Sequence, residues 1–219
     1  MAQQERAIRT RHAILKAAAS VFDDRGYEAA TIGEILNRAG VTKGALYFHF
    51  PSKQALAEGV LGEQFSVLTV ASRVCKLQQL VDLGLVTAYH MRRDPVVSAA
   101  TRLSLEGEMG SQFGPRMIGE WIAATQKILT EAKAQGELLP HVDPAETAWL
   151  FSASWTGVQV YSHSLDDRAD LEERVAALLQ HLLPAVAVPA VLSRLDIRAE
   201  RAAEVGPESE RLAHEERAG

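Results

Sequence analysis

A short segment near the N-terminus combines a lysine, a tyrosine and small residues in a spacing that suits contact with nucleic acid. Lys43 and Tyr47 are four residues apart, so a helix would place them on one face, with Gly44 beside them. A lysine ammonium can donate to the O6 and N7 atoms of guanine, and small residues let a backbone approach a duplex closely. These residue types predict that Lys43 contacts bases.

The same segment offers groups that could bind the phosphates of a duplex. Hydroxyl, imidazole and ammonium groups donate hydrogen bonds to anions, and helix N-termini attract them. We expect phosphate contacts from Thr31, Tyr47, His49 and Lys53, while Thr42 and Gly44 face the duplex beside Lys43.

Residues that would support catalysis or metal binding are not grouped in this sequence. The seven histidines show no metal-ligand spacing, and the single cysteine, Cys75, has no partner in a motif. Gly107, Gly110 and Gly114 follow no predicted strand, which makes them a poor nucleotide-binding loop. We therefore expect no enzyme, no metal and no cofactor.

Two short helices around a glycine turn are predicted to position the candidate DNA-binding residues. Thr31 followed by Glu34 is a capping-box pattern, and the helix that it begins should end at Gly40. Thr42 is a good N-cap for a third helix, Lys43 to Phe48. Two short helices joined by a tight turn form a helix-turn-helix, whose second helix enters the major groove.

Flanking helices should complete this small unit. An apolar stripe predicts a first helix of about five turns that ends at Gly26, and Ser52 can cap a fourth helix. In the third helix, we expect Ala45, Leu46 and Phe48 to face the core.

The remaining sequence predicts more helices and no strands. Apolar periodicity and loop signals place helices at about 77–92, 95–108, 115–135, 144–163 and 168–183, with a break between Gly110 and Pro115. The fold class is therefore all-α. We expect three regions: a helix-turn-helix domain at 1–51, a larger ligand-binding and dimerisation domain at 52–197 with a connector helix at 52–68, and a charged, disordered tail at 198–219.

The charge distribution separates the first sixty residues from the rest. The chain carries a net charge of −5, yet residues 1–59 hold eight Lys and Arg against six Asp and Glu. A DNA-binding face therefore belongs to this segment. No signal peptide or membrane span is evident, so we expect a cytoplasmic protein, associated with the nucleoid and not with a membrane.

The N-terminal segment resembles the TetR family of repressors. The resemblance is carried by Thr31-Ile32-Gly33-Glu34-Ile35-Leu36, by the run from Ala39 to Phe50, and by Ser52-Lys53 and Leu56. It implies a homodimer that represses transcription until a small molecule binds the C-terminal domain.

Further segments are similar to the γ-butyrolactone autoregulator receptors of actinomycetes. They are Arg6 to Arg11, Gly136 to Pro140, Gly157 to Val160, and Leu183-Pro184-Ala185 with Val188-Pro189. This resemblance implies a diffusible γ-butyrolactone or butenolide signal and control of secondary-metabolite genes. The alternatives are a pseudo-receptor that responds to antibiotics or intermediates, and a helical interaction protein that does not bind DNA.

Five residues are candidates for the ligand site. By its spacing alone Trp121 is a core residue, whereas the subgroup resemblance implies that it lines the ligand pocket. Gln64 and Thr156 are polar residues on apolar helical faces, so they either orient a ligand or are solvated. Phe151 and Trp155 are apolar walls of the pocket or simply core.

A hypothesis for the mechanism links this site to DNA. A ligand that pulls on the connector helix at Gln64 would change the separation of the two third helices across the dimer. Operator half-sites about 34 Å apart could then not be engaged together. The helices at 144–163 and 168–183 are expected to form the dimer interface.

Overall fold

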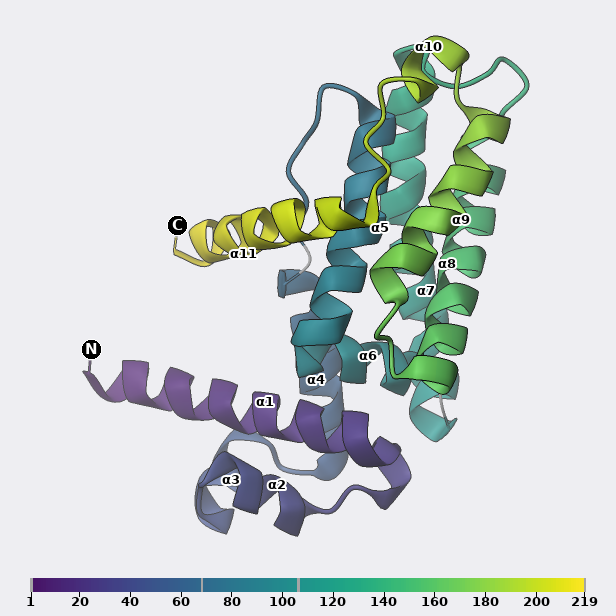
Figure 1. Cartoon of the computed structure of the whole chain (residues 1–219). Helices are drawn as coiled ribbons and strands as arrows, with labels where there is room; N and C mark the ends of the chain where they lie inside the picture. Colours follow the sequence, from purple (N-terminus) through teal and green to yellow (C-terminus); the bar gives the residue numbers. More distant parts are fainter. Residues whose placement is uncertain (1, 68, 106, 219) are drawn as a thin grey trace. The chain divides into compact units, whose positions relative to one another are not determined.

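The computed structural model describes residues 2–67, 69–105 and 107–218, and these form helices joined by short segments (Figure 1). No β-strand occurs among these residues; Leu138 and Ala187 form an isolated antiparallel bridge. The predicted all-α class is confirmed. None of the described helices combines the length and the apolar character needed to cross a membrane.

The first of two compact units consists of the chain up to Val67 together with Asp94–Met117. Its elements are α1 (Ala2–Ala29), α2 (Ile32–Ala39), α3 (Lys43–His49), α4 (Lys53–Val67), α6 (Pro95–Leu105) and the start of α7 (Gly107–Ala134). As predicted, regular helix is interrupted at Gly26, whose φ of 74° produces a kink inside α1. Beyond this kink α2 and α3 pack against α1 (Figure 1).

The core of this unit extends beyond the predicted boundary at residue 51. Leu56 and Val60 of α4 are buried in the same cluster as Phe22 of α1, and Leu103 of α6 joins them. At Gly59 an added Cβ would lie 2.8 Å from the Leu15 side chain, so α4 lies very close to α1. The helix predicted as a connector is therefore an integral part of the first unit, because its apolar face completes that unit's core.

The predicted break between Gly110 and Pro115 is wrong, because both residues lie inside α7. The chain turns earlier, at Gly107, where φ is +60°. Cβ atoms added at Gly110 and Gly114 would lie 2.8 and 2.5 Å from backbone atoms of α6, so these glycines permit close packing of two helices. Helix α7 begins in the first unit and continues past Met117 into the second.

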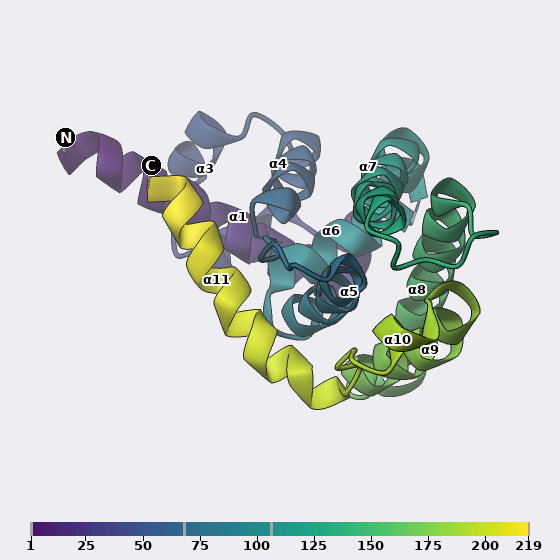
Figure 2. The same ribbon diagram turned by 90° about the horizontal axis from the view of Figure 1, so that it is seen from above.

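The second unit contains the described residues of 69–93 and 118–218. Its elements are α5 (Lys76–Arg93), the remainder of α7, α8 (Pro144–Asp166), α9 (Leu171–Val186), α10 (Pro189–Leu192), the 3-10 turn η1 (Ala199–Arg201) and α11 (Ala202–Ala218). Helix α9 packs against both α5 and α8, and α11 crosses α5 (Figure 2).

The tail predicted to be disordered is a helix with a buried face, so that prediction is wrong for the described part of the tail. Ala202, Val205, Ser209 and Ala213 of α11 are buried. Ion pairs add to this packing. The fully buried carboxylate of Asp82 in α5 accepts hydrogen bonds from Arg201 at 2.6 and 2.8 Å and from Arg73 at 2.7 Å. Arg73 also pairs with Glu208 of α11. Small buried residues gave α11 a weak apolar signal in the sequence.

Candidate functional site

The N-terminus of α2 is closed by the predicted capping box. The Thr31 hydroxyl accepts the Glu34 N–H at 3.2 Å, while the Glu34 carboxylate accepts the Thr31 N–H at 3.0 Å and its O–H at 2.8 Å. These hydrogen bonds from Thr31 lower the pKa of the Glu34 carboxyl. The donor groups of Thr31 are therefore satisfied within the protein, and a phosphate contact by Thr31 would have to compete with Glu34.

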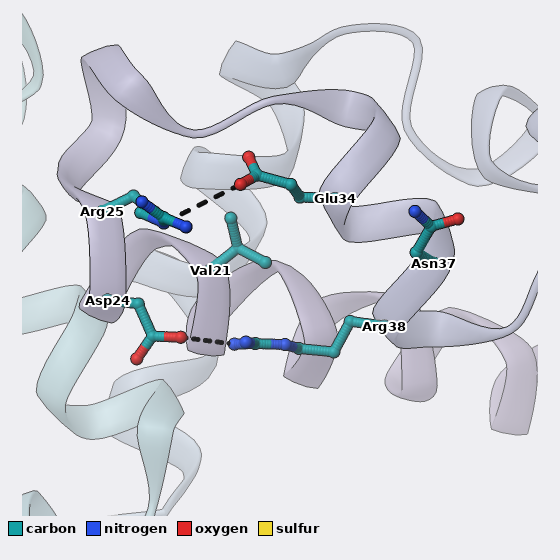
Figure 3. Close-up of a pocket in the computed structure, with 6 residues that line it drawn as sticks. All are labelled: Val21, Asp24, Arg25, Glu34, Asn37 and Arg38. Carbon is teal, nitrogen blue, oxygen red and sulfur yellow. Dashed lines mark hydrogen bonds and ion pairs between the residues drawn. The ribbon is translucent and has the colours of Figure 1, made fainter.

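Charged side chains hold α2 on α1 around a depression of about 400 Å³ (Figure 3). Arg38 donates to Asp24 at 2.7 Å and to the Ser20 hydroxyl at 2.5 Å, while Arg25 lies 3.8 Å from Glu34. These pairs were not predicted from the sequence. Because they link the two helices, they fix the position of the helix-turn-helix on its supporting helix.

The turn between α2 and α3 has the predicted chemistry. Gly40 adopts a left-handed conformation with φ 64°, and its N–H donates to the Leu36 carbonyl at 3.0 Å. The Thr42 hydroxyl then accepts the Ala45 N–H at 3.3 Å and caps α3. Leu46 is fully buried, as predicted, and this anchors α3 to the core.

The opposite side of α3 presents most of the predicted DNA-binding residues to solvent. Thr42, Lys43, Gly44 and Tyr47 are exposed, and His49 is half-buried. The Lys43 Nζ lies 5.9 Å from the centre of the Tyr47 ring, so the two side chains share one surface. An exposed cation, an aromatic hydroxyl and an open glycine thus occupy one short helical face.

One prediction about this region is wrong. Phe48 was expected in the core but is 82% exposed, with its ring 5.0 Å from the His49 ring in an edge-on arrangement. Since Leu46 already faces inward, Phe48 two residues later points elsewhere on a helix of seven residues. Lys53 remains a prediction: its ammonium donates to the Glu28 carbonyl at 3.1 Å and lies 4.6 Å from the Tyr27 ring centre, and an ammonium has three N–H donors, so this bond does not exclude a phosphate.

In the second unit, three of the predicted ligand-site residues form an aromatic cluster. The Trp121 ring of α7 lies 6.4 Å from the Phe151 ring and 5.7 Å from the Trp155 ring, both of α8. Trp155 donates its indole N–H to the Gly84 carbonyl of α5 at 3.3 Å. The Nε1 of Trp121 is buried but has no hydrogen-bond partner among the described residues.

Of the two polar residues predicted for the ligand site, the structure describes the side chain of one. Thr156 is half-buried on α8, one residue after Trp155. Gln64 lies on α4, and its side chain is outside the described residues. Gln159 on α8 was not predicted as a site residue; it is buried, and its Oε1 has no partner in the described structure. Its position four residues after Trp155 could have revealed it.

The outer face of α8 carries large apolar side chains. Trp149, Leu150, Val160, Tyr161 and Leu165 are all exposed, with Leu165 at 81%. A stripe of this kind on a well-formed helix is typical of a surface that a protein partner covers.

Comparison with protein families decides what kind of protein combines these features. Residues 14–60 match the family described as bacterial regulatory proteins, tetR family, and residues 115–178 match the tetracyclin repressor-like C-terminal domain. Over 219 residues the chain is 44% identical to the A-factor receptor protein of Streptomyces griseus, covering 99% of this chain and 79% of that protein. The chain belongs to the TetR family.

Solved structures of other TetR-family proteins agree with this fold. The TetR regulator TylP from Streptomyces fradiae has a TM-score of 0.83 and 45% identity, with 93% of this chain and 99% of that chain covered. A γ-butyrolactone receptor described as an ArpA-like protein has a TM-score of 0.71 and 29% identity, with 96% and 99% covered. Membership of the TetR family makes this chain a DNA-binding transcriptional regulator and not an enzyme.

Among the described residues, no group of three or more His, Cys, Asp and Glu side chains could hold a metal ion.

Proposed function

We propose that this TetR-family chain is a cytoplasmic, ligand-responsive repressor of secondary-metabolite genes that leaves its operator when a γ-butyrolactone or butenolide binds the second unit. The observation that carries the proposal is the coexistence of an exposed α3 surface with a buried, unpaired indole N–H at Trp121. The first suits a duplex, and the second suits a small molecule with a hydrogen-bond acceptor.

In the DNA-bound state, α3 enters the major groove and Lys43 donates to a guanine. Thr42, Gly44 and Tyr47 lie on the same exposed surface and supply phosphate and close backbone contacts. His49 is half-buried beside Phe48, so we assign it a phosphate contact at the edge of this surface. Thr31 donates to a phosphate only if DNA displaces Glu34, whereas Lys53 can donate to a phosphate and keep its bond to the Glu28 carbonyl.

A homodimer presents α3 twice to a palindromic operator. We assign its interface to α8 and α9, because exposed apolar side chains such as Tyr161 and Leu165 would be buried there. Two copies related by twofold symmetry can then reach half-sites about 34 Å apart.

Ligand binding acts by favouring a DNA-incompetent arrangement. Phe151 and Trp155 provide apolar walls, while Trp121 and Thr156 supply polar groups that orient the ligand. Helix α4 carries Gln64 and shares the core of the DNA-binding unit, so a pull on α4 would move α3. Shifting the population in this way requires a ligand that prefers one state by a few kcal/mol.

The experiment is a mobility-shift assay on DNA upstream of the chain's own gene, with and without a synthetic γ-butyrolactone or an extract of the producing culture. We expect a shift that the lactone or the extract abolishes. Lys43→Ala and Tyr47→Ala should weaken the shift, whereas the exposed Lys127→Ala, in the second unit, serves as a control.

The possible outcomes separate the two halves of the proposal. Unchanged operator binding in folded Lys43→Ala and Tyr47→Ala variants would refute the role of α3. A shift that responds to antibiotics but not to lactones would identify a pseudo-receptor instead.

A further inference from the structure

Phe48 of α3 exposes a large apolar ring to solvent. Its side chain is 82% exposed, compared with 41% for Tyr47 on the same helix. The His49 ring lies 5.0 Å away with its plane at 81°, so the two rings are not stacked face to face. Water disfavours an uncovered ring of this size, and a residue in this state gains free energy when a partner covers it.

The direction of Phe48 follows from the buried residue of the same helix. Successive side chains of an α-helix are about 100° apart around its axis, and Leu46 points into the core. Phe48 and Gly44, two residues to either side of Leu46, therefore lie about 160° from it, whereas Lys43 lies about 60° from it. Phe48 and Gly44 thus point most directly away from the core, and Lys43 lies at the edge of the exposed face.

The space beside the Phe48 ring on this face is open. Residues four apart are neighbours on a helix, and the neighbour of Phe48 toward the N-terminus of α3 is Gly44. A Cβ added at Gly44 would meet no described atom within 4 Å. A base edge that approaches over Gly44 can therefore reach the ring without displacing a side chain at that position.

We propose that Phe48 recognises thymine in the operator by packing its ring against the C5 methyl group in the major groove. This inference rests on the proposed function, since it requires α3 to lie in that groove. Thymine is the base that presents a methyl group there, and the phenyl ring has no hydrogen-bonding group for the edges of the other bases. Phe48 thus determines specificity for thymine, while Lys43 donates to guanine.

A contact between Phe48 and the sugar-phosphate backbone would fit its chemistry less well. Phosphates are bound by cationic and polar groups, and Lys43, Tyr47 and the helix N-terminus already offer these on α3. A ring packed on a methyl group instead removes apolar surface of both partners from water.

The test replaces thymine by deoxyuridine, which pairs in the same way but lacks the C5 methyl group. The operator is first located by footprinting the full-length protein on DNA upstream of its own gene. Symmetric pairs of thymines in the protected half-sites are then replaced one pair at a time, and affinity is measured by fluorescence anisotropy. At one pair or more, wild-type affinity should fall about fourfold for each half-site, as expected for the loss of one buried methyl group.

Variants assign this loss to the ring. Phe48→Ala should bind the thymine operator more weakly and should bind the deoxyuridine operator with the same affinity as the thymine operator. Lys43→Ala should bind more weakly and keep the deoxyuridine effect, because its contact is with another base. Val74→Ala truncates an apolar side chain in the second unit that is 94% exposed, and it should behave as wild type.

The outcomes separate this inference from the proposed function. A footprint in which no deoxyuridine pair lowers the affinity would overturn the role of Phe48 and leave operator binding intact. A deoxyuridine effect of wild-type size in Phe48→Ala would assign the methyl contact to another residue, and would also overturn it. Equal weakening of operator and unrelated DNA by Phe48→Ala would indicate a backbone contact instead. Absence of any footprint would refute operator binding and this inference together.

Discussion

Helices α3 and α8 distribute their polar and apolar side chains in opposite ways. On α3 the buried residue is Leu46, the cap is satisfied by Thr42, and Lys43 is in solvent. On α8 the Ser152 Oγ and the Gln159 Oε1 are buried with no hydrogen-bond partner among the described residues, while large apolar residues on its outer face are exposed. The first helix follows the usual apolar-in, polar-out rule except at Phe48, and the second breaks it on two faces.

The difference indicates which surfaces of the isolated chain still lack a partner. A sequence folds well when its local and global preferences agree, and departures from that agreement concentrate at functional sites. The buried polar atoms of α8 suit a small molecule, and its exposed apolar side chains suit a second copy of the chain. The exposed Phe48 of α3 lies on the face assigned to DNA.

The largest effect should come from the buried side of α3. Leu46→Ala would remove a fully buried side chain and lower the free energy of unfolding by about 2–5 kcal/mol. Phe48→Ala, two residues away but exposed, should change it by no more than about 0.5 kcal/mol. Denaturant unfolding of the two variants measures the contrast, and equal losses would mean that the two sides of α3 are not distinct.

The outer face of α8 should matter for assembly more than for folding. The double variant Tyr161→Glu and Leu165→Glu places charges in the proposed interface and should weaken dimerisation by about 2–4 kcal/mol, as losses at interface centres do. Sedimentation of this variant should show monomers with retained helical circular dichroism. Gln126→Glu, exposed on α7, is the control for added charge. A dimer unaffected by both glutamates would place the interface elsewhere.

Acid should weaken the paired polar groups of the second unit. Hydrogen bonding to Arg198 lowers the pKa of Asp196 from 3.8 to about 2. The stabilisation that this carboxylate provides is therefore present above pH 3.8 and is lost as the pH falls toward 2. Since the pair is largely solvated, we expect a loss of about 1 kcal/mol.

Thermal unfolding between pH 5 and pH 2 measures this loss, and Asp196→Asn should reduce the dependence on pH. An Asp196→Asn variant with the full acid sensitivity of wild type would assign that sensitivity to other carboxylates.

The smallest effect concerns Gly44 on the exposed side of α3. An added Cβ would meet nothing within 4 Å, so Gly44→Ala should stabilise the helix by about 0.5–1 kcal/mol. Operator binding should nevertheless weaken, because the methyl group would stand between the backbone and the duplex. Gly119→Ala on α7 has equally open surroundings and should stabilise without changing operator affinity. Unchanged operator affinity in Gly44→Ala would place the duplex away from this residue.

The sequence predicted the helix-turn-helix well because its signals are local. Thr31 with Glu34, Gly40 and Thr42 each specify a cap or a turn through neighbours a few residues away. Gly110 and Gly114 were predicted to form a loop because a glycine pair is a common loop signal, whereas they permit the close approach of α7 to α6, a tertiary contact. The helical tail was missed for a similar reason, since its buried residues are small and its ion pairs join residues more than a hundred positions apart.

The sequence predicted the aromatic residues of the candidate ligand site, because large aromatic side chains are usually buried. Trp121, Phe151 and Trp155 were identified as candidates and do lie together, but spacing could not tell which indole would lack a partner. Phe48 was placed in the core because its type is apolar, whereas its direction is set by the short helix that Leu46 anchors.

Helix α7 joins the two units without an intervening loop. Met117 is buried in the core of the first unit, and Trp121, one turn later on the same helix, belongs to the aromatic cluster of the second. With a rise of about 1.5 Å per residue, the two side chains are about 6 Å apart along one axis. Met117 and Trp121 therefore share one turn of α7, so unwinding of that turn would disturb both side chains.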